Sequence, residues 1–327
     1  MEGDDECEKG ECKTDSEELI EEVKRRYRSI EELKKEFADL NLNVETDFEI
    51  MTNLITEYKE TTSTERRAVI LQDLEYYVHQ VDNAVDLERL GGWEILMAAL
   101  NDTSEALQTE AAHVIGSAVQ SNPKAQVAAI DHGAMQLLLH LLRTTPSPST
   151  QKRALFGLSS LLRFFPYAQK KFLDLGGLNL LSGLVQEDTP GRMPLQIKSV
   201  TLLHDLLIEQ RNALSSPEAI DDQSEERKLQ YEKINLAPKM VEQGWCDFVP
   251  KLLEISDHDT REKVLHLLEV LLPHCRHFKS NRALLDRLAS LSRDYHSLAT
   301  EESSDAGNID EYFSSLESLV DRILSQI

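Results

Sequence analysis

Glycine, proline and cysteine are scarce in this chain of 327 residues, which contains 13 Gly, 10 Pro and 4 Cys. Few glycines and prolines argue against an architecture of strands and tight turns, and four cysteines are too few for a disulfide scaffold. No apolar run approaches the roughly 20 residues that a membrane-spanning helix needs. These absences favour a helical protein whose core is built from the 41% of residues that are hydrophobic.

Basic residues are also scarce relative to acidic ones: the chain has 35 Lys and Arg against 58 Asp and Glu, a net charge of −23. Nucleic acids and anionic membranes are poor partners for such a surface, because binding them depends on basic groups that release counterions. We expect neither nucleic-acid binding nor membrane insertion. A partner protein with a basic face fits better, and the alternative is that the charge mainly keeps an elongated chain soluble.

Sequence motifs for catalysis and nucleotide binding are missing: there is no GxxxxGK[ST] or GxGxxG loop, no GxSxG turn and no HExxH pair. His274, Cys275 and His277 resemble metal ligands, with His266 nearby. Tetrahedral zinc needs four converging ligands, and His266 is more than two helical turns from the others. We interpret these as ordinary polar residues near a helix end, and predict a protein that is not an enzyme and holds no metal or cofactor.

A short phrase around glycine returns along the chain. It first reads Leu90-Gly91-Gly92-Trp93 and returns as His132–Met135, Leu175–Leu178 and Gln243–Cys246. Gly91, Gly133 and Gly176 are 42 and 43 residues apart, and the step to Gly244 is 68 residues, one period plus an insertion. A period of about 40–47 residues built only of helices is typical of armadillo and HEAT repeats. The pattern predicts an all-α, right-handed armadillo/HEAT-like solenoid with helical caps at both ends.

Within each repeat, the glycine is expected in a turn between a short helix and a longer one, since glycine adopts positive φ without a Cβ clash. The helix after the glycine is predicted at Trp93–Leu100, Met135–Leu142, Leu178–Val185 and Cys246–Glu254. The last helix of each repeat is predicted at Glu105–Ser121, Ser149–Phe165, Leu195–Gln210 and Thr260–His274. Pro123 and Pro166 stand at the same phase, where these last helices should stop.

The two ends of the chain are expected to cap the repeats. We predict an acidic disordered tail over 1–16, capping helices over 17–62, repeats over 63–295 with a polar insertion at 211–235, and an acidic loop and capping helix over 296–327. Apolar spacing predicts one amphipathic helix over Leu19–Leu40, a second through about Tyr58 and a third over Glu65–Val81. Thr14–Glu17 and Thr46–Glu49 have the pattern of capping boxes before the first two helices.

The last helices of armadillo-like repeats line the concave groove of the superhelix, so residues at one phase of them form a row. We call this row the ladder and expect it to hold Glu75, Ser117, Ser160, Asp205 and Glu269, with His79 and Phe164 one turn further on. These residues predict an acidic and aromatic groove that suits a basic, partly apolar protein surface. The alternative is that they are ordinary solvated positions on helix surfaces.

Two further groups of residues are candidates for covalent modification. Cys7 and Cys12 form a close pair in the acidic tail, where they could close a small disulfide or exchange with a partner, although the flanking acids work against thiol reactivity. Asn101 begins the sequon Asn101-Asp102-Thr103, which matters only in a secretory compartment.

Four longer segments of the sequence resemble the armadillo-type nucleotide exchange factors of 70-kDa heat-shock chaperones. The resemblance extends over about Arg25 to Tyr295 and is carried by Leu71–Ala84, Ser121–Val127, Leu161–Gln169 and Glu242–Cys246. Among these factors, the chain is most similar to those that serve BiP in the endoplasmic reticulum lumen. The resemblance implies four armadillo-like repeats that grip one lobe of the chaperone's ATPase domain, open its nucleotide cleft and release ADP.

The resemblance also carries expectations about mechanism, oligomeric state and cellular location. It implies that the exchange factor acts as a monomer without covalent catalysis, in the endoplasmic reticulum lumen. The family's signal peptide and lumenal retention signal are not found in this sequence, which begins MEGDDECEKGEC and ends with Leu324–Ile327. Fungal relatives use an N-terminal cysteine pair in redox control, which Cys7 and Cys12 resemble only in being close together. The rival interpretation is an armadillo scaffold that holds an extended peptide and has no exchange activity.

Overall fold

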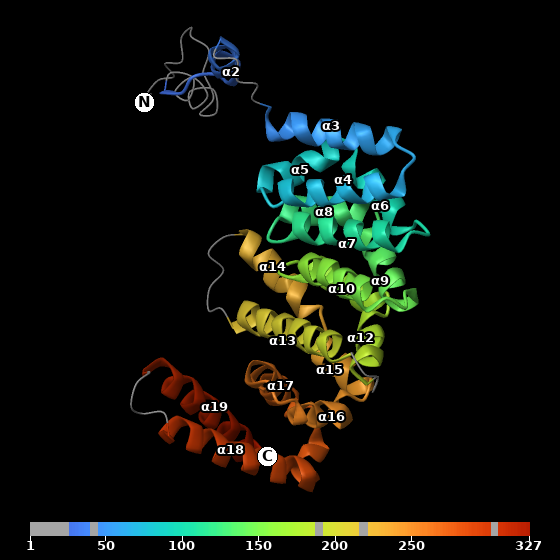
Figure 1. Cartoon of the computed structure of the whole chain (residues 1–327). Helices are drawn as coiled ribbons and strands as arrows, with labels where there is room; N and C mark the ends of the chain where they lie inside the picture. The colour runs from blue at the N-terminus through green and yellow to red at the C-terminus, as the bar shows by residue number, and fades with distance from the viewer. Residues whose placement is uncertain (1–25, 40–44, 187–191, 216–221, 302–306) are drawn as a thin grey trace, which may run out of the picture. The chain divides into compact units, whose positions relative to one another are not determined.

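The computed structural model describes residues 26–39, 45–186, 192–215, 222–301 and 307–327, and within these ranges the secondary structure is helical, without a strand (Figure 1). The chain divides into two compact units, Met1–Ile50 and Met51–Ile327. In the described ranges no helix combines the length and the hydropathy that crossing a bilayer would demand. The predicted tail over 1–16 lies outside the described residues, as do the capping box at Thr14–Glu17 and the acidic stretch 302–306.

The first unit corrects one predicted helix. Instead of one helix over Leu19–Leu40, the chain leaves the helical conformation at Tyr27–Ser29, and α2 (Ile30–Asp39) begins afresh. The break follows from a capping box: Ser29 Oγ accepts the Glu32 N–H at 3.1 Å, and Glu32 Oε2 accepts the Ser29 N–H at 3.2 Å. The periodicity of apolar residues continues across this break, so the apolar pattern alone does not reveal where the helix is interrupted.

The predicted capping box at Thr46–Glu49 is confirmed at the start of α3 (Asp47–Glu60). Glu49 Oε2 accepts the Thr46 N–H at 2.9 Å, and Thr46 Oγ1 accepts the Glu49 N–H at 3.3 Å. Lys34 Nζ also donates to Glu49 Oε1 at 2.5 Å. The hydrogen bonds from Lys34 and Thr46 together lower the pKa of Glu49 to about 2.

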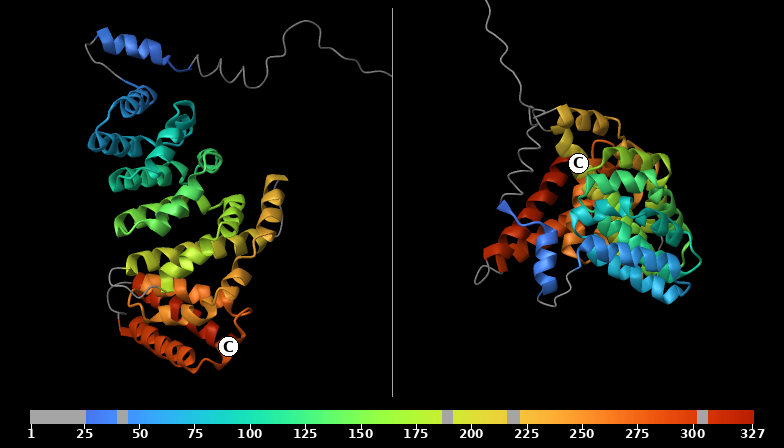
Figure 2. Two further views of the ribbon diagram at one scale, coloured as in Figure 1. Left: turned by 90° about the vertical axis from the view of Figure 1, so that its right-hand side faces the viewer. Right: turned by 90° about the horizontal axis from the view of Figure 1, so that it is seen from above.

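The second unit repeats a pattern of a short helix, a second helix and a long third helix (Figures 1 and 2). After α4 (Thr64–Tyr77), three repeats follow in chain order: α5 (Val81–Arg89), α6 (Gly92–Leu100) and α7 (Glu105–Val119); α8 (Pro123–Asp131), α9 (Ala134–Thr144) and α10 (Pro148–Leu162); α11 (Pro166–Asp174), α12 (Gly177–Gln186) and α13 (Met193–Ser215). The remainder comprises α14 (Asp222–Glu232), α15 (Leu236–Glu242), α16 (Trp245–Phe248), the 3₁₀ helix η1 (Val249–Glu254), α17 (His258–Leu271), η2 (Arg276–Ser280), α18 (Arg282–Glu301) and α19 (Gly307–Gln326).

The glycine phrase marks the turn that the sequence predicts. Gly91, Gly133, Gly176 and Gly244 all have positive φ, between 67° and 84°, and each directly precedes or opens the second helix of its repeat. An L-residue with a Cβ rarely adopts this conformation, which explains why glycine returns at this phase. The repeat period and the helix order predicted from it are confirmed.

The prolines act differently from the prediction. The long helices α7 and α10 end at Val119 and Leu162, a few residues before the proline, and Pro123 and Pro166 occupy the first turn of the next helices, α8 and α11. The connecting residues Ser121 and Phe164 have φ of 55° and 58°, so the chain turns there through the left-handed region. The predicted ends at Ser121 and Phe165 are therefore too late.

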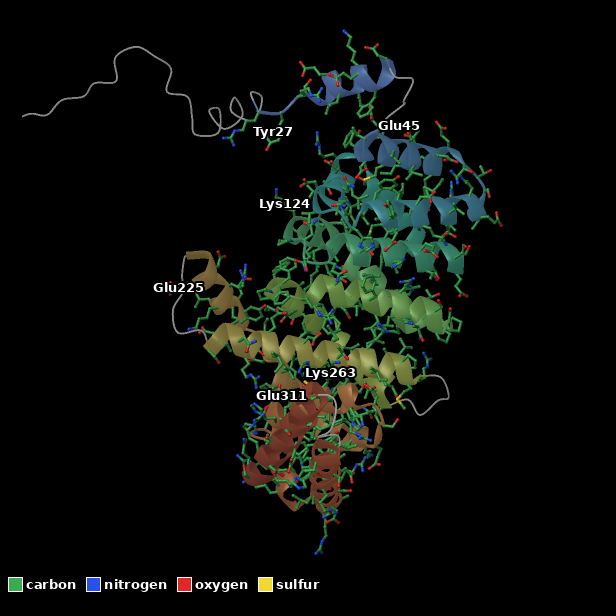
Figure 3. All side chains as sticks on the ribbon, turned by 60° about the vertical axis from the view of Figure 1, so that its left-hand side comes forward. Tyr27, Glu45, Lys124, Glu225, Lys263 and Glu311 are labelled. Atoms are coloured by element: carbon green, nitrogen blue, oxygen red, sulfur yellow. A yellow bond between two sulfur atoms is a disulfide. The ribbon has the colours of Figure 1, made fainter. Side chains whose placement is uncertain are left out.

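The insertion at 211–235 contains ordered helix within its described part. The long helix α13 continues through Ser215, and α14 packs against α13 and α11 (Figure 3, in which Glu225 marks α14). Tyr231 at the end of α14 is only 1% exposed, and Ile234 after it is buried. These buried apolar residues, which the polar composition of the stretch obscures, attach the insertion to the repeats.

The long helices α4, α7, α10, α13 and α17 form a layer in which each packs against the next, and α19 packs against α17 (Figure 2). Helices α7 and α10 approach closely at Gly116 and Gly157: a Cβ on Gly116 would lie 2.4 Å from the Phe156 ring, and one on Gly157 would lie 3.2 Å from the Ala112 carbonyl oxygen. This sequential packing confirms the predicted all-α solenoid. The C-terminal helix α19, which buries Leu316, Val320 and Ile323, matches the predicted final helix.

A disulfide joins Cys246 at the start of α16 to Cys275 before η2, with the Cα atoms 5.6 Å apart. Both residues are buried. The sequence alone did not indicate this bond, because the two cysteines are separated by 29 residues and no pairing pattern connects them. Cys275 is therefore not a free thiol for the metal site that its histidine neighbours suggested.

The disulfide should stabilise the C-terminal repeats. Closing a loop of 29 residues restricts the unfolded chain and contributes about 3 kcal/mol. We expect a reducing agent to lower the thermal midpoint of the wild-type chain and to leave that of a Cys246→Ala/Cys275→Ala variant unchanged, as measured by circular dichroism. An equal response of the double variant would assign the effect to Cys7 and Cys12 instead.

Candidate functional site

The structure distributes the ladder over the layer of long helices. Its residues lie one on each helix in turn: Glu75 on α4, Ser117 on α7, Ser160 on α10, Asp205 on α13 and Glu269 on α17. Because these helices pack in the same order, the ladder residues follow one another across one layer. Direct side-chain contacts join some of them to their neighbours, as the clusters below show.

The N-terminal end of the ladder is a cluster around the Glu75 carboxylate. Ser117 Oγ donates to Glu75 Oε1 at 2.7 Å, which confirms that these two residues, 42 positions apart, meet in space. His79 Nε2 lies 2.8 Å and His113 Nε2 lies 3.2 Å from the same oxygen. The predicted residues His79, Glu75 and Ser117 are thus brought together, and His113 joins them.

Electrostatics keep this carboxylate charged. Burial raises the pKa of Glu75, but the Ser117 hydrogen bond and the adjacent His113 and His79 outweigh it, so the pKa lies below its ordinary value. Burial lowers the pKa of His113, and the attraction of Glu75 only partly offsets that effect. Because both pKa values are lowered, Glu75 is ionised and His113 is neutral near neutral pH.

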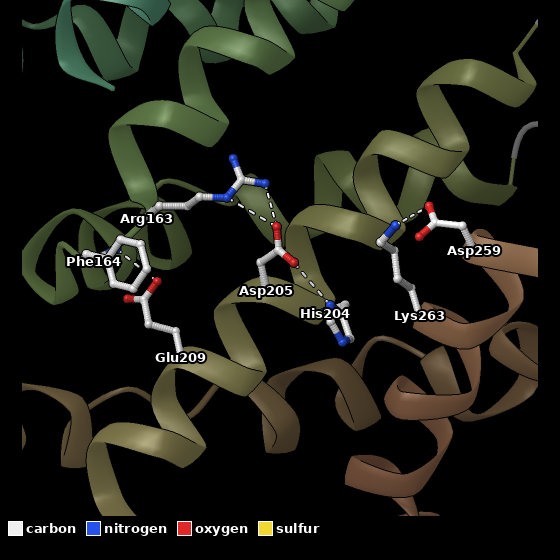
Figure 4. Close-up of polar contacts among 7 residues, drawn as sticks. All are labelled: Arg163, Phe164, His204, Asp205, Glu209, Asp259 and Lys263. Atoms are coloured by element: carbon white, nitrogen blue, oxygen red, sulfur yellow. Dashed lines mark hydrogen bonds and ion pairs between the residues drawn. The ribbon is translucent and has the colours of Figure 1, made fainter. Parts of the chain in front are cut away.

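In the middle of the ladder, Asp205 is paired within the chain (Figure 4). Arg163 Nη2 donates to Asp205 Oδ2 at 2.5 Å and Arg163 Nε donates to the same oxygen at 3.2 Å, while His204 Nδ1 lies 3.1 Å from Oδ1. Burial raises the pKa of Asp205, but His204 and Arg163 outweigh it and lower it. Ser160 is buried, and its backbone carbonyl accepts a hydrogen bond from Gln126 at 3.1 Å.

At the C-terminal end, Glu269 has basic neighbours from three helices. Arg322 of α19 donates to Glu269 Oε1 at 2.6 Å, and Arg211 of α13 and His266 of α17 lie 3.8 and 3.5 Å from Oε2. Burial raises the pKa of Glu269, but Arg322 and His266 outweigh it, so that the pKa is lowered. A pocket with apolar walls opens beside Glu269 between α13, α15 and α17.

These pairings change the interpretation of the groove. The sequence predicted a row of acids available to a basic partner, whereas Asp205 and Glu269 are bound to arginines of their own chain and Glu75 to a serine and histidines. Arg211 and Arg322 were not predicted because nothing in the repeat phase marks them, whereas Arg163 lies 42 residues before Asp205, one repeat period away. The row is therefore of mixed charge.

Phe164, one turn beyond the ladder, has an exposed side chain and a fixed backbone. Its side chain is 67% exposed. Its N–H donates to Glu209 Oε2 at 2.8 Å (Figure 4). Glu209 Oε1 accepts a hydrogen bond from Gln169 at 2.7 Å. Tyr231 also donates to Glu209.

Aromatic rings form part of the same layer, and sequence reasoning missed them. The rings of His113 and Phe156 are 5.9 Å apart, and those of His204 and His266 are 5.4 Å apart. The signal was available for the first pair, since 113 and 156 are separated by the same 43 residues as Ser117 and Ser160. His266, weighed as a metal ligand, packs against a ring of the neighbouring helix.

The remaining candidates lie apart from this layer. Asn101 is exposed directly after α6, in the turn that leads to α7, where its side chain is accessible. Cys7 and Cys12 fall outside the described residues, so the redox role predicted for them stays a prediction.

Replacing Ser117 by alanine should destabilise the fold by about 1 kcal/mol near pH 7, because a buried hydroxyl would no longer donate to the ionised Glu75. The pKa of Glu75 is lower in the folded chain than its ordinary value, so this contribution is present above the unfolded pKa and is lost as the pH falls through the folded value. Urea unfolding at about pH 7 and about pH 4 should therefore show a smaller effect in acid.

Ser160→Ala supplies the matched control, at the equivalent position of the next repeat. Ser160 is equally buried, and the described structure shows only its backbone carbonyl in a hydrogen bond with another side chain. Equal losses of stability in the two variants at both pH values would contradict a specific contribution from the Ser117–Glu75 contact.

Known proteins resemble this chain in sequence and in fold. The chain is 43% identical to a nucleotide exchange factor SIL1 of Xenopus laevis over 94% of its own length and 67% of the relative's, and 45% identical to a SIL1 of Rattus norvegicus over 91% and 65%. It therefore spans about two thirds of the length of these relatives. A designed armadillo repeat protein in complex with the peptide (KR)4 superimposes with a TM-score of 0.56 at 13% identity, covering 84% of this chain and 99% of that one.

The structural likeness supports the fold, and the sequence match gives the family. Residues 83–327 match the family described as the SIL1/FES1/HPBP1 C-terminal domain. This match begins within α5 and includes the rest of the first repeat, the two repeats that follow, the ladder residues from Ser117 to Glu269, and the C-terminal helices. The chain belongs to the SIL1/FES1/HPBP1 C-terminal domain family.

Proposed function

We propose that this chain is an adenine-nucleotide exchange factor for a lumenal 70-kDa heat-shock chaperone of the BiP type. The observation that carries the proposal is the sequence match over residues 83–327, together with relatives named nucleotide exchange factor SIL1 and, at 33% identity, the Hsp70 nucleotide exchange factor FES1 of Mycosarcoma maydis. The helical repeat architecture supports it, because a layer of parallel long helices offers an extended surface to a folded partner.

The proposed mechanism is a shift of the chaperone's conformational equilibrium. A partner that binds the open ATPase domain more tightly than the closed one favours the open form, from which ADP leaves and ATP can bind. The exchange factor supplies binding free energy and no covalent step. Thermodynamic linkage makes the effect reciprocal, so ADP must weaken the binding of the exchange factor by the same factor by which the exchange factor weakens ADP binding.

The ladder is the surface proposed for this contact, with His79 and Phe164 at its edge. Its mixed charge suits a folded protein surface that carries both signs, since ion pairs such as Arg163–Asp205 can exchange partners across an interface. The 23 excess negative charges of the chain favour a partner with a basic face and would accelerate its approach.

Two structural features support residence in a secretory compartment. The Cys246–Cys275 disulfide is of a kind that persists in oxidising environments and is rare in the cytosol. Asn101, with its exposed side chain and its sequon, is an acceptor for glycosylation in the same compartments. We propose that the chain acts there as a monomer, since the described contact surface needs no second copy.

The proposed function is tested by the release of a fluorescent ADP analogue from a purified lumenal 70-kDa chaperone. We expect sub-stoichiometric amounts of this chain to accelerate release at least about tenfold, which corresponds to a barrier to ADP release that is lower by about 1.4 kcal/mol. Calorimetry should show weaker binding of this chain to the ADP-bound than to the nucleotide-free chaperone, by the factor by which the chain weakens ADP binding. Tight binding without faster release would indicate a scaffold, and absence of both would favour the peptide-groove alternative.

The ladder assignment is tested by the variant Glu75→Gln/Asp205→Asn/Glu269→Gln, which removes three negative charges and keeps side-chain shape. We expect about tenfold weaker binding to the ATPase domain and a weaker dependence of the association rate on salt. A control variant, Glu105→Gln/Glu225→Gln/Glu311→Gln, removes the same charge from exposed positions outside the ladder. Equal effects of the two variants would show that net charge, and not the ladder, determines affinity.

A further inference from the structure

Phe164 combines two features that rarely occur together. Its backbone lies in the left-handed region, with φ of 58°, a conformation that residues other than glycine seldom adopt and that is unusual for a bulky side chain. Its side chain is nevertheless 67% exposed. Burial of the ring therefore does not offset the free-energy cost of the left-handed backbone. Another interaction must hold Phe164 in this conformation.

The backbone of Phe164 is held by Glu209 of α13. Glu209 Oε2 accepts the Phe164 N–H at 2.8 Å, and Glu209 Oε1 is bound by Gln169 of α11 at 2.7 Å and by the hydroxyl of Tyr231 of α14. Gln169 and Tyr231 are both almost fully buried. Residues of α11 and α14 thus fix the carboxylate that α13 carries, and that carboxylate fixes the turn at Phe164.

The neighbours of Phe164 show that its exposure is a consequence of this turn. The next residue, Phe165, packs against the core and contacts the ring of Tyr167 at 5.9 Å, whereas Tyr167 itself is exposed. The preceding residue, Arg163, binds the ladder residue Asp205. The Phe164 ring is therefore held at the edge of the ladder, beside the Arg163–Asp205 pair (Figure 4).

The equivalent turn of the preceding repeat provides a comparison. Ser121 precedes Asn122 and Pro123 as Phe164 precedes Phe165 and Pro166, and its φ of 55° is almost the same. The two positions thus share a backbone conformation and differ in the side chain that it presents. The repeat needs the turn, but it does not need an aromatic ring there.

We propose that Phe164 is a preformed aromatic anchor that enters an apolar pocket of the chaperone's ATPase domain, and that Glu209 and Tyr231 are its positioning residues; this inference rests on the proposed function. A few aromatic residues often carry most of the binding free energy of an interface. Fixing such a residue before binding reduces the conformational entropy that binding removes. The insertion helix α14 contributes by supplying Tyr231.

The anchor is tested by binding kinetics with the nucleotide-free ATPase domain. We expect Phe164→Ala and Phe164→Gly each to weaken binding at least about tenfold, mainly through faster dissociation, and Phe164→Leu to recover part of the loss. Phe164→Gly should also keep or raise the thermal midpoint, because glycine adopts positive φ freely. The matched variant Ser121→Gly changes the equivalent backbone and should leave affinity unchanged.

The positioning role is tested by Tyr231→Phe, which removes only the hydroxyl. We expect about threefold weaker binding in the wild-type background and no further loss in the Phe164→Gly background, as measured in a double-mutant cycle. Equal losses in the two backgrounds would overturn the positioning role, because a general structural effect does not depend on residue 164. Amide hydrogen exchange at Phe164 should become faster in Tyr231→Phe.

The outcomes separate the two proposals. Wild-type binding that Phe164→Ala does not weaken overturns the anchor and leaves the proposed function standing. Loss of affinity in Ser121→Gly equal to that in Phe164→Gly also overturns the anchor, since it assigns the effect to the backbone. Absence of wild-type binding overturns the proposed function and the anchor together.

Discussion

The close packing of the long helices, above all of α7 on α10, is the constraint on which the rest of the structure depends. Gly116 and Gly157 allow these two backbones to approach so closely that a methyl group on either would meet a ring or a carbonyl. The equivalent packing of α4 on α7 brings Ser117 and Glu75 within hydrogen-bonding reach. The proposed contact surface is therefore a by-product of how the core is packed.

The same packing explains why the charges of the ladder are neutralised within the chain. A carboxylate that is partly buried between helices loses hydration and needs compensating hydrogen bonds or opposite charge. Glu75, Asp205 and Glu269 each obtain these from the adjacent helix, and the pKa of each is lowered despite burial. The proposed recognition of a partner by this surface relies on the exchange of ion pairs and on exposed rings rather than on simple attraction of opposite charges.

Several parts of the site could be anticipated from the sequence because they follow the repeat period. The glycine turns, the order of helices and the meeting of Glu75 with Ser117 all follow from residues about 42 apart on a regular array. His113 and Phe156 share that signal. Arg322, which binds Glu269, could not be found in this way, because α19 lies outside the period and reaches the ladder only through its packing on α17.

The sequence by itself determined the helical class, the repeat length and the positions that need glycine, since these depend on local backbone preference and on the spacing of apolar residues. The break at Ser29 is also local, since the Ser29–Glu32 capping box makes it, but the apolar spacing does not mark it. Only the tertiary structure decided the Cys246–Cys275 bond, the packing of α14 and the exposed state of Phe164. Each of these depends on contacts between residues that are far apart in the sequence. Their contacts depend on how successive repeats are placed, which no local pattern specifies.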